Sequence, residues 1–207
     1  MVIIMESIQQ VKNEKNISDQ TGKSHTTEVN IDLLKTRAKN IGIHLDDSML
    51  EAFVSYYHKM IEENRVMNLT SITDWNDVVD LHYIDSLSIA ITEFEAVQEK
   101  HFLDSLSGFA VLEEFLTDKE EGTPVHMIDI GTGAGFPAIP LKIAYPHLKI
   151  VMVDSLQKRV GFLNDVIADL HLSGIKAVHG RAEDIGHDPL YREKFDLCVS
   201  RAVANLS

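Results

Sequence analysis

The stretch IDIGTGAGFP, residues 128–137, decides the fold, because it joins a short apolar run to a segment with helical spacing. Its glycines, Gly131, Gly133 and Gly135, let the backbone turn tightly and let a ligand approach where Cβ atoms would block it. Dinucleotide-binding enzymes space their glycines as G-x-G-x-x-G, whereas these alternate as G-x-G-x-G and Phe136 takes the sixth place. The turn therefore predicts a ligand site between a strand and a helix.

Around this turn, from Val125 onward, short apolar runs alternate with segments of helical spacing, which is typical of βαβ units and a parallel sheet. In order, these segments are VHMIDIG, AIPLKIAYP, KIVMVDS, LQKRVGFLNDVIADLHL, IKAVHG and FDLCVSRAV. The run DKEEGTP, residues 118–124, looks like a hinge before them. We therefore predict an α/β domain over residues 121–207.

The residues before the hinge predict a small helical N-terminal subdomain over residues 30–120. The segments of helical spacing are Ile31–Ile43, Asp47–Met67 and a stretch that ends near Thr117. Asp47 is placed as an N-cap, and NLTSIT, residues 68–73, interrupts the helical pattern. Residues 1–29 are mostly polar after the first five, and we expect them to form a flexible N-terminal extension.

Within the helical subdomain, one segment occurs twice in tandem at an offset of nineteen residues, over residues 72–90 and 91–110. Identical pairs are Ile72/Ile91, Thr73/Thr92, Val78/Val97, His82/His101, Asp85/Asp104, Ser86/Ser105, Leu87/Leu106 and Ser88/Ser107. Two copies are too few for a solenoid, which needs at least three stacked units. Nineteen positions on one continuous helix amount to about five turns plus about 100°, so the copies would face different directions. We expect one His-Asp-Ser set to line a site and the other to be spare and surface-exposed.

The composition, with 44% hydrophobic and 25% charged residues, indicates a globular protein. The formal net charge of −13 argues against broad adhesion to nucleic acid, because phosphate binding needs clustered Lys and Arg. The charge is uneven, since residues 1–135 hold 10 basic and 24 acidic side chains and residues 136–207 hold 9 and 8. A single cysteine, Cys198, and an N-terminal apolar run too short for a membrane span predict a cytoplasmic protein with no metal and no membrane partner.

An acid at a strand end followed by alternating glycines resembles motif I of class I S-adenosylmethionine-dependent methyltransferases. In this chain the acid is Asp129 and the first glycine is Gly131. Asp154 ends the next predicted strand, where a carboxylate can accept hydrogen bonds from both ribose hydroxyls. The same aspartate also suits an N-cap for the segment LQKRVGFL, and the two roles are compatible.

Longer motifs resemble the RsmG family, formerly GidB, of 16S ribosomal RNA guanine-N7 methyltransferases. The resemblance runs over about Ile31–Ser207 and rests on NLTSIT, HFLDSL, DIGTGAGFPAIPLKIAYPHLKIVMVDSLQKRVGFL, HGRAED and SRAVANLS. It implies a Rossmann-like class I methyltransferase sheet with strands 3-2-1-4 visible, and S-adenosyl-L-methionine as the cofactor. It also implies methyl transfer to N7 of the guanosine at position 527, with 16S rRNA or the small ribosomal subunit as the partner of a monomer.

The resemblance assigns site residues as well. The implied cofactor contacts are Asp129, Gly131, Gly133, Gly135, Phe136, Asp154, Ser155, Ala182, Glu183 and Arg201. The implied substrate contacts are Arg201, His101, Asp104 and Ser105. Ala182 and Glu183 would offer adenine a backbone amide and an acceptor, and Arg201 would hold the methionine carboxylate or an RNA phosphate. Further candidate phosphate partners are Lys142, Lys149, Lys158 and Arg159. Each assignment competes with an ordinary role in a surface loop or a surface ion pair.

Two features depart from the family pattern. The duplication looks like an insertion of nineteen residues. His82 has the expected short distance from Asn68, whereas His101 matches the family wording HFLDSL. Both copies therefore stay open, and the wording favours His101, Asp104 and Ser105. The chain also ends at Ser207, after the fourth predicted strand, whereas the family sheet has seven strands in the order 3-2-1-4-5-7-6. This would leave FDLCVS as an unpaired sheet edge. We therefore expect a truncated chain that binds the cofactor poorly.

The implied chemistry explains why no catalytic residue is assigned. Guanine N7 has an exposed lone pair and no proton, so its attack on a sulfonium methyl needs no general base. Three alternatives stay open. One is a class I methyltransferase for a small molecule or a protein, favoured by the acidic balance; another is an inactive RNA-binding fragment; the third is a dinucleotide-dependent oxidoreductase, which the glycine spacing opposes.

Overall fold

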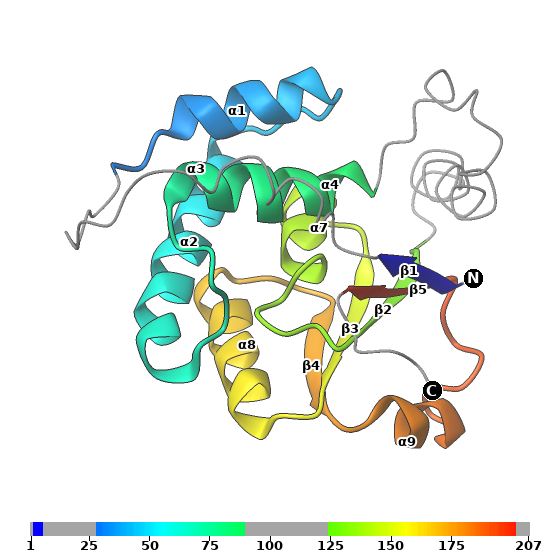
Figure 1. Cartoon of the computed structure of the whole chain (residues 1–207). Coiled ribbons are helices and arrows are strands. Elements are labelled where there is room, and N and C mark those ends of the chain that lie inside the picture. Colours follow the sequence, from blue (N-terminus) through cyan, green and yellow to red (C-terminus); the bar gives the residue numbers. More distant parts are fainter. Residues whose placement is uncertain (1, 6–27, 90–123, 202–207) are drawn as a thin grey trace, which may run out of the picture.

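The computed structural model describes residues 2–5, 28–89 and 124–201 of the chain. Within these residues, parallel strands form one sheet in the order β1-β5-β2-β3-β4 (Figure 1). The strands are β1 (Val2–Met5), β2 (His126–Ile130), β3 (Lys149–Asp154), β4 (Ile175–His179) and β5 (Leu197–Arg201). The run β4-β3-β2-β5 has the predicted order 3-2-1-4, so the predicted fold class is confirmed.

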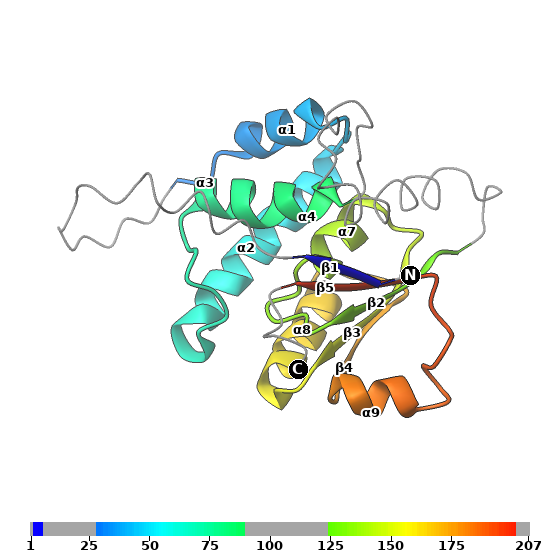
Figure 2. The ribbon, with the colours of Figure 1, turned by 45° about the vertical axis from the view of Figure 1, so that its right-hand side comes forward.

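Helices cover both faces of the sheet (Figure 2). The connecting helices are α7 (Ala138–Ala144), α8 (Gln157–Asp169) and α9 (Ala182–His187). Successive residues of a strand point to opposite faces, and β3 follows this rule. Ile150 and Met152 join the large core with α7 and α8, whereas Val153 packs with Ile185 of α9 on the other face.

The N-terminal part is helical, as predicted. Its elements are α1 (Ile31–Asn40), α2 (Asp47–Met67), α3 (Trp75–Val78), the π-helical segment η2 (Val79–Ile84) and α4 (Asp85–Ser88). The predicted N-cap of α2 is wrong by one residue. Asp46 has an extended backbone and its Oδ1 accepts a hydrogen bond from the Met49 amide at 2.8 Å, so Asp47 is already the first helical residue.

The segments α3, η2 and α4 follow one another without a break from Trp75 to Ser88. They contain most of the first copy of the duplicated segment. The predicted continuation of this helical stretch toward Thr117 and the second copy, residues 91–110, lie outside the described residues.

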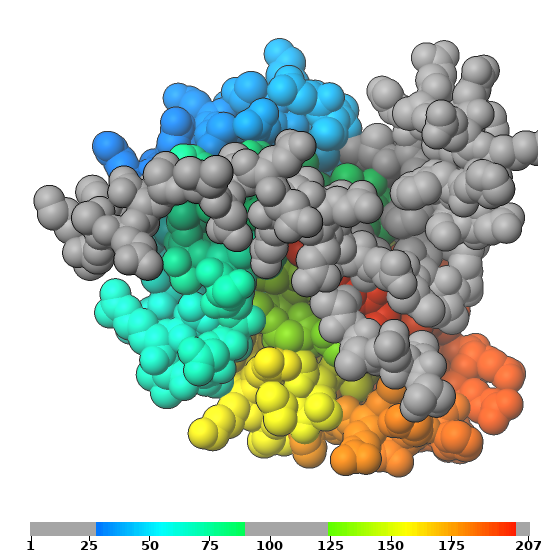
Figure 3. All heavy atoms as spheres, in the orientation of Figure 1, coloured from blue at the N-terminus to red at the C-terminus, as the bar shows by residue number. Residues whose placement is uncertain are grey.

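The N-terminal helices and the sheet share a core. Helix α2 packs against both α7 and α8, and the cyan surface of α2 borders the yellow surface of α8 in Figure 3. The largest fully buried side chains include Trp75, Tyr56, Tyr83 and Phe53 from the helices and Met127 and Ile139 from the α/β part. The division into separate subdomains therefore stays a prediction, because the described helices and sheet bury one continuous apolar cluster.

Strand β1 corrects the expectation of an unpaired edge. It lies parallel to β5, with Val2 opposite Cys198 and Met5 opposite Arg201. These residues were expected to belong to a flexible extension, but the apolar sequence VIIM suits a strand that covers an edge. In the part of the chain that the structure describes, no helix is long and apolar enough to cross a membrane.

Candidate functional site

The glycine turn leaves the carboxyl end of β2 and leads into α7. Gly131, Gly133 and Gly135 have φ angles of 74°, 59° and 104°, in the left-handed region that favours glycine. At Gly135 a Cβ would lie 2.7 Å from Ile139 Cγ1 and 3.0 Å from the Tyr56 hydroxyl. The path of the turn therefore requires glycine here on both conformational and steric grounds.

The end of β3 fixes the shape of this turn. The amides of Gly131 and Thr132 donate to the Val153 carbonyl at 2.9 and 3.1 Å. The side chain of the next residue continues the contact, because Asp154 Oδ2 accepts from the Gly133 amide at 3.0 Å. The turn is thus hydrogen-bonded to the neighbouring strand through both backbone and side chain.

Asp154 also organises the start of α8. Its Oδ1 accepts from the Leu156 amide at 2.9 Å, and Arg159 Nη1 lies 3.5 Å from its Oδ2. The side chain of Asp154 is 3% exposed. Leu156 is the N-cap of α8, so Asp154 closes the turn that precedes the helix and does not act as the predicted cap. These bonds hold the carboxylate in one orientation at the carboxyl end of β3.

Asp129 is fully buried near the end of β2. Its Oδ2 accepts from the Thr132 hydroxyl at 2.6 Å, whereas Oδ1 has no well-aligned hydrogen-bond partner among the described residues. Burial raises the pKa of Asp129 to about 7, although the Thr132 hydroxyl and the Ala138 amide favour its charged form. The turn therefore contains a buried carboxyl group with one acceptor to spare.

Arg201 brings a positive charge to the end of β5. Its Nη2 donates to the Leu81 carbonyl at 2.8 Å, and its Nη1 lies 3.1 Å from Asp85 Oδ2. Nη1 is buried and is not aligned for a normal hydrogen bond, so this contact is an ion pair. Burial raises the pKa of Asp85, and the Arg201 charge acts against that shift. The first copy of the duplicated segment thus holds the arginine.

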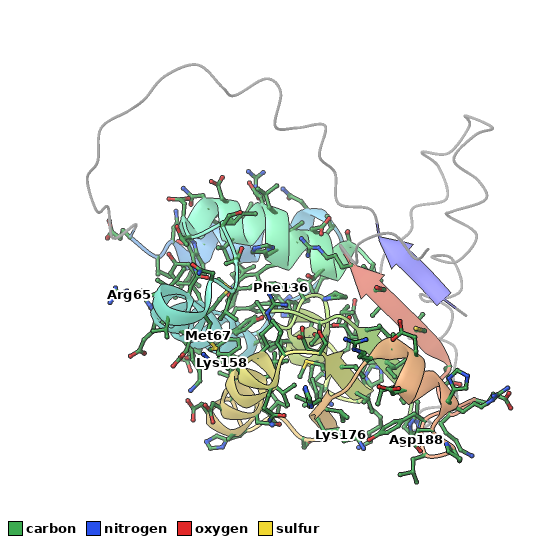
Figure 4. The ribbon with its side chains drawn as sticks, turned by 60° about the horizontal axis from the view of Figure 1, so that its bottom comes forward. Arg65, Met67, Phe136, Lys158, Lys176 and Asp188 are labelled. Carbon is green, nitrogen blue, oxygen red and sulfur yellow. The ribbon has the colours of Figure 1, made fainter. Side chains whose placement is uncertain are left out.

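Phe136 lies between the N-terminal helices and the sheet (Figure 4). Its ring is 7% exposed and stacks on His82, with ring centroids 4.3 Å apart and an interplanar angle of 15°. The rings of Tyr56 and Tyr83 lie 5.5 and 6.1 Å from it, in tilted orientations. The ring therefore anchors the glycine turn to the helices.

Tyr56 is a site residue that the sequence did not reveal. Its hydroxyl donates to the Ala134 carbonyl inside the glycine turn, at 2.5 Å. Burial raises the pKa of Tyr56 well above its usual value, so the hydroxyl keeps its proton and remains a donor. In the sequence this tyrosine occupies an apolar position of an amphipathic helix, and no signal separates it from an ordinary core residue.

The remaining predicted residues fall into two groups. Ser155, Ala182 and Glu183 are exposed and follow the carboxyl ends of β3 and β4, and the Ser155 carbonyl lies 3.0 Å from His179 Nε2. The predicted substrate contacts in the second copy lie outside the described residues. They are His101, Asp104 and Ser105.

Lys142 is not available to a phosphate, which corrects its assignment as a candidate partner. It is 2% exposed, and its Nζ donates to the carbonyls of Pro146 and Leu148. Burial lowers its pKa to about 8. Lysine has a long apolar stem, and here the ammonium satisfies carbonyls between α7 and β3 instead of reaching solvent.

The carboxyl edge of a parallel sheet is where ligands bind in open α/β folds. At this edge the structure brings together the glycine turn, Asp154 and Arg201 from three adjacent strands. Over residues 2–5, 28–89 and 124–201, no group of three or more His, Cys, Asp or Glu side chains is placed to hold a metal ion.

This sheet order and glycine turn define a Rossmann-like domain of the class I methyltransferase type. The chain belongs to the GidB family, described as rRNA small subunit methyltransferase G, whose family model matches residues 89–207.

Relatives with this description support the assignment to the family. Ribosomal RNA small subunit methyltransferase G of Leuconostoc citreum is 45% identical over 166 residues, which cover 80% of this chain and 59% of the relative. The protein of the same name from Alkaliphilus metalliredigens is 44% identical over 175 residues, or 84% and 62% of the two chains. This chain therefore spans about three-fifths of the length of these relatives. A solved protein-L-isoaspartate O-methyltransferase is similar over 83% of this chain and 47% of its own length, at 15% identity and a TM-score of 0.41.

Proposed function

We propose that this chain binds S-adenosyl-L-methionine and methylates N7 of a guanosine in 16S ribosomal RNA. The observation that carries the proposal is the hydrogen bond from the Gly133 amide to Asp154, which joins the glycine turn to the acid at the next strand end. Membership of the GidB family supports the same activity.

The residues at the carboxyl edge fit the parts of this cofactor. Asp154 would accept from the ribose hydroxyls, the spare oxygen of Asp129 would accept from the ammonium group, and Arg201 would pair with the carboxylate. A Cβ at Gly133 would meet no atom closer than 4.0 Å, so the turn leaves free space beside Asp154. Ser155, Ala182 and Glu183 would complete the side nearest the adenine. When bound, the cofactor supplies an electrophilic methyl group on a sulfonium sulfur.

The protein's part in the reaction is then positioning. Guanine N7 carries no proton, so the site needs no general base and its residues hold the two reactants in line. The Arg201 guanidinium and the buried Asp129 carboxyl group would orient the methionine end of the cofactor, and the hydrogen-bonded glycine turn would hold the nucleoside end.

The proposed partner is 16S rRNA, either free or in the small ribosomal subunit, and the proposed setting is the cytoplasm, where the chain acts as a monomer. The charge distribution supports contact through the second half of the chain, which carries 9 basic and 8 acidic side chains over residues 136–207. Proteins generally recognise a single RNA base that has left its base stack, through contacts to its edge and stacking on side chains.

Labelled cofactor tests the proposal. The chain is incubated with deproteinised 16S rRNA, with small subunits, and with small molecules and proteins as competing acceptors, and the labelled product is identified after digestion. We expect 7-methylguanosine from RNA or subunits. Label only in protein or small molecules would support the alternative methyltransferase, and RNA binding without transfer would support the inactive fragment.

A matched pair of glycine variants ties the activity to the glycine turn. Gly133→Val places a side chain in the free space beside Asp154, whereas Gly42→Val changes a residue of similar φ, 79°, that has no neighbour within 4 Å of an added Cβ. We expect transfer to be lost in the first variant and retained in the second. Equal activity in both would contradict the proposed cofactor site.

A further inference from the structure

His82 connects three parts of the molecule through one buried ring. The residue is 8% exposed and stacks on Phe136. Its Nε2 lies 2.8 Å from Thr70 Oγ1, and its Nδ1 lies 3.3 Å from Arg201 Nη2. Both ring nitrogens therefore have polar partners, one on each side of the ring.

The chemistry of these partners determines where the proton lies. A guanidinium can only donate, so Nδ1 of His82 must accept from Arg201. The proton is then on Nε2, which donates to the Thr70 hydroxyl. Burial, and secondly the Arg201 charge, lower the pKa of His82 to about 4, so the ring is neutral at neutral pH.

Thr70 is itself fixed at the end of α2. Its amide donates to Asn64 Oδ1 and its carbonyl accepts from Asn64 Nδ2, both at 2.9 Å. Its hydroxyl also accepts from the Ile72 amide at 3.1 Å. A hydrogen-bonded chain thus runs from Asn64 through Thr70 and His82 to Arg201.

This series of hydrogen bonds joins the motifs NLTSIT, the first His-x-x-Asp-Ser-Leu segment and SRAV, which are separate in the sequence. An arginine has many rotamers, and ordering it on binding would weaken affinity. Here the Leu81 carbonyl, His82 and Asp85 already hold its guanidinium, and all three belong to the first copy. Among the described residues, the buried Nη1 has an ion pair with Asp85 but no aligned hydrogen bond.

We propose that Thr70 and His82 are positioning residues that hold Arg201 in the orientation that binds the carboxylate of the cofactor, and that the first copy of the duplicated segment has this role. The proposal rests on the proposed function, because it assumes that this site takes S-adenosylmethionine.

Two variants remove the hydrogen bonds of the His82 ring and of the Thr70 hydroxyl with little change in shape. His82→Phe keeps an aromatic ring on Phe136 and removes the Nδ1 acceptor, and Thr70→Val removes the hydroxyl. His58→Phe, on the exposed side of α2, and Thr73→Val, in the same loop as Thr70, are the matched controls. Calorimetry with S-adenosylhomocysteine measures the dissociation constant of each, and thermal unfolding confirms that each is folded.

We expect His82→Phe to weaken binding about tenfold, the effect of one hydrogen bond to a charged group, and Thr70→Val to weaken it several-fold, the effect of a hydrogen bond between neutral groups. In an Arg201→Ala background the same substitutions should have no further effect on binding, because their role acts through the arginine. A purely structural role would give additive losses. Additive losses, or wild-type affinity in both variants, would overturn the proposal.

The equivalent substitution in the second copy, His101→Phe, decides between the copies. A loss of affinity as large as that of His82→Phe would overturn the assignment to the first copy. If the wild type itself binds no S-adenosylhomocysteine, the proposed function fails. The positioning of Arg201 is then tested by urea unfolding of the same single and double variants, where additive changes between His82→Phe and Arg201→Ala would overturn it.

Discussion

The hydroxyl of Tyr56 on α2 donates a hydrogen bond to the carbonyl of Ala134 in the glycine turn, 78 positions further along the chain. The N-terminal helices are therefore part of the cofactor site that we propose. A second contact, the stacking of His82 on Phe136, reaches the same turn from η2. Both contacts predict that changes in these helices alter cofactor affinity.

Removing the tyrosine hydroxyl tests this connection. Tyr56→Phe keeps the aromatic packing and frees the Ala134 carbonyl, so the turn loses one buried hydrogen bond and S-adenosylhomocysteine should bind several-fold more weakly. Tyr83→Phe is the matched control, because its hydroxyl is equally buried and donates to the Phe53 carbonyl at 3.0 Å, away from the turn. Both variants should lose about 1 kcal/mol of unfolding free energy. Equal effects on affinity would show that Tyr56 serves stability alone.

A methyl group at Gly135 should destabilise the fold. In Gly135→Ala the Cβ would lie 2.7 Å from Ile139 and 3.0 Å from Leu163 Cδ2, and φ is 104°. Gly42→Ala is the control, since φ is 79° and nothing lies within 4 Å of the added atom. We expect a loss of about 1 kcal/mol at Gly42 from the backbone alone, and at least about 2 kcal/mol more at Gly135 from overpacking. Urea unfolding measures both, and similar losses would contradict the packing around the turn.

The buried imidazole of His82 should make stability depend on pH. Its pKa is lowered from 6.5 to about 4, so between these values the unfolded state binds more protons than the folded state. The stability that it contributes is present above pH 6.5 and is lost as the pH falls through about 4. The free-energy difference between wild type and His82→Phe should therefore shrink between pH 7 and pH 4.5. A constant difference across this range would contradict a buried, neutral imidazole.

The buried carboxyl group of Asp129 should make stability depend on pH with the opposite sign to that of His82. Its pKa is raised from 3.8 to about 7, so the folded state binds the extra proton in this interval. The stabilisation is present below pH 3.8 and is lost as the pH rises through about 7. Asp129→Asn, which mimics the protonated group, should gain stability relative to wild type between pH 5 and pH 8. Unfolding free energies measured across that range would show no relative gain if the carboxyl group were ionised throughout.

Much of the α/β part could be predicted from the sequence, because its signals are local. Alternating apolar runs and helical segments predict the strands and a parallel sheet, and the glycine spacing predicts the turn. The strand order was implied by the resemblance to the family. Strand β1 was not predicted, because the four residues VIIM do not indicate which strand they pair with. Its partner, β5, is almost two hundred residues away along the chain.

The residues of the candidate site were harder to predict from the sequence, because their contacts depend on tertiary packing. His82 and His101 have nearly the same neighbours in sequence, so sequence alone could not select the copy that meets Arg201. Tyr56 has the pattern of a core residue, and Lys142 has the pattern of a surface charge. Their hydrogen bonds to backbone carbonyls form only when α2 packs on the glycine turn and the segment between α7 and β3 folds over Lys142.

The most direct test of the account is a crystal structure of the chain with S-adenosylhomocysteine, interpreted together with the affinity of Asp154→Asn. We predict that the ribose hydroxyls lie within hydrogen-bond distance of the Asp154 carboxylate, beside Gly133, and that the variant binds at least about tenfold more weakly. A ligand bound elsewhere, or a variant with the affinity of the wild type, would contradict it.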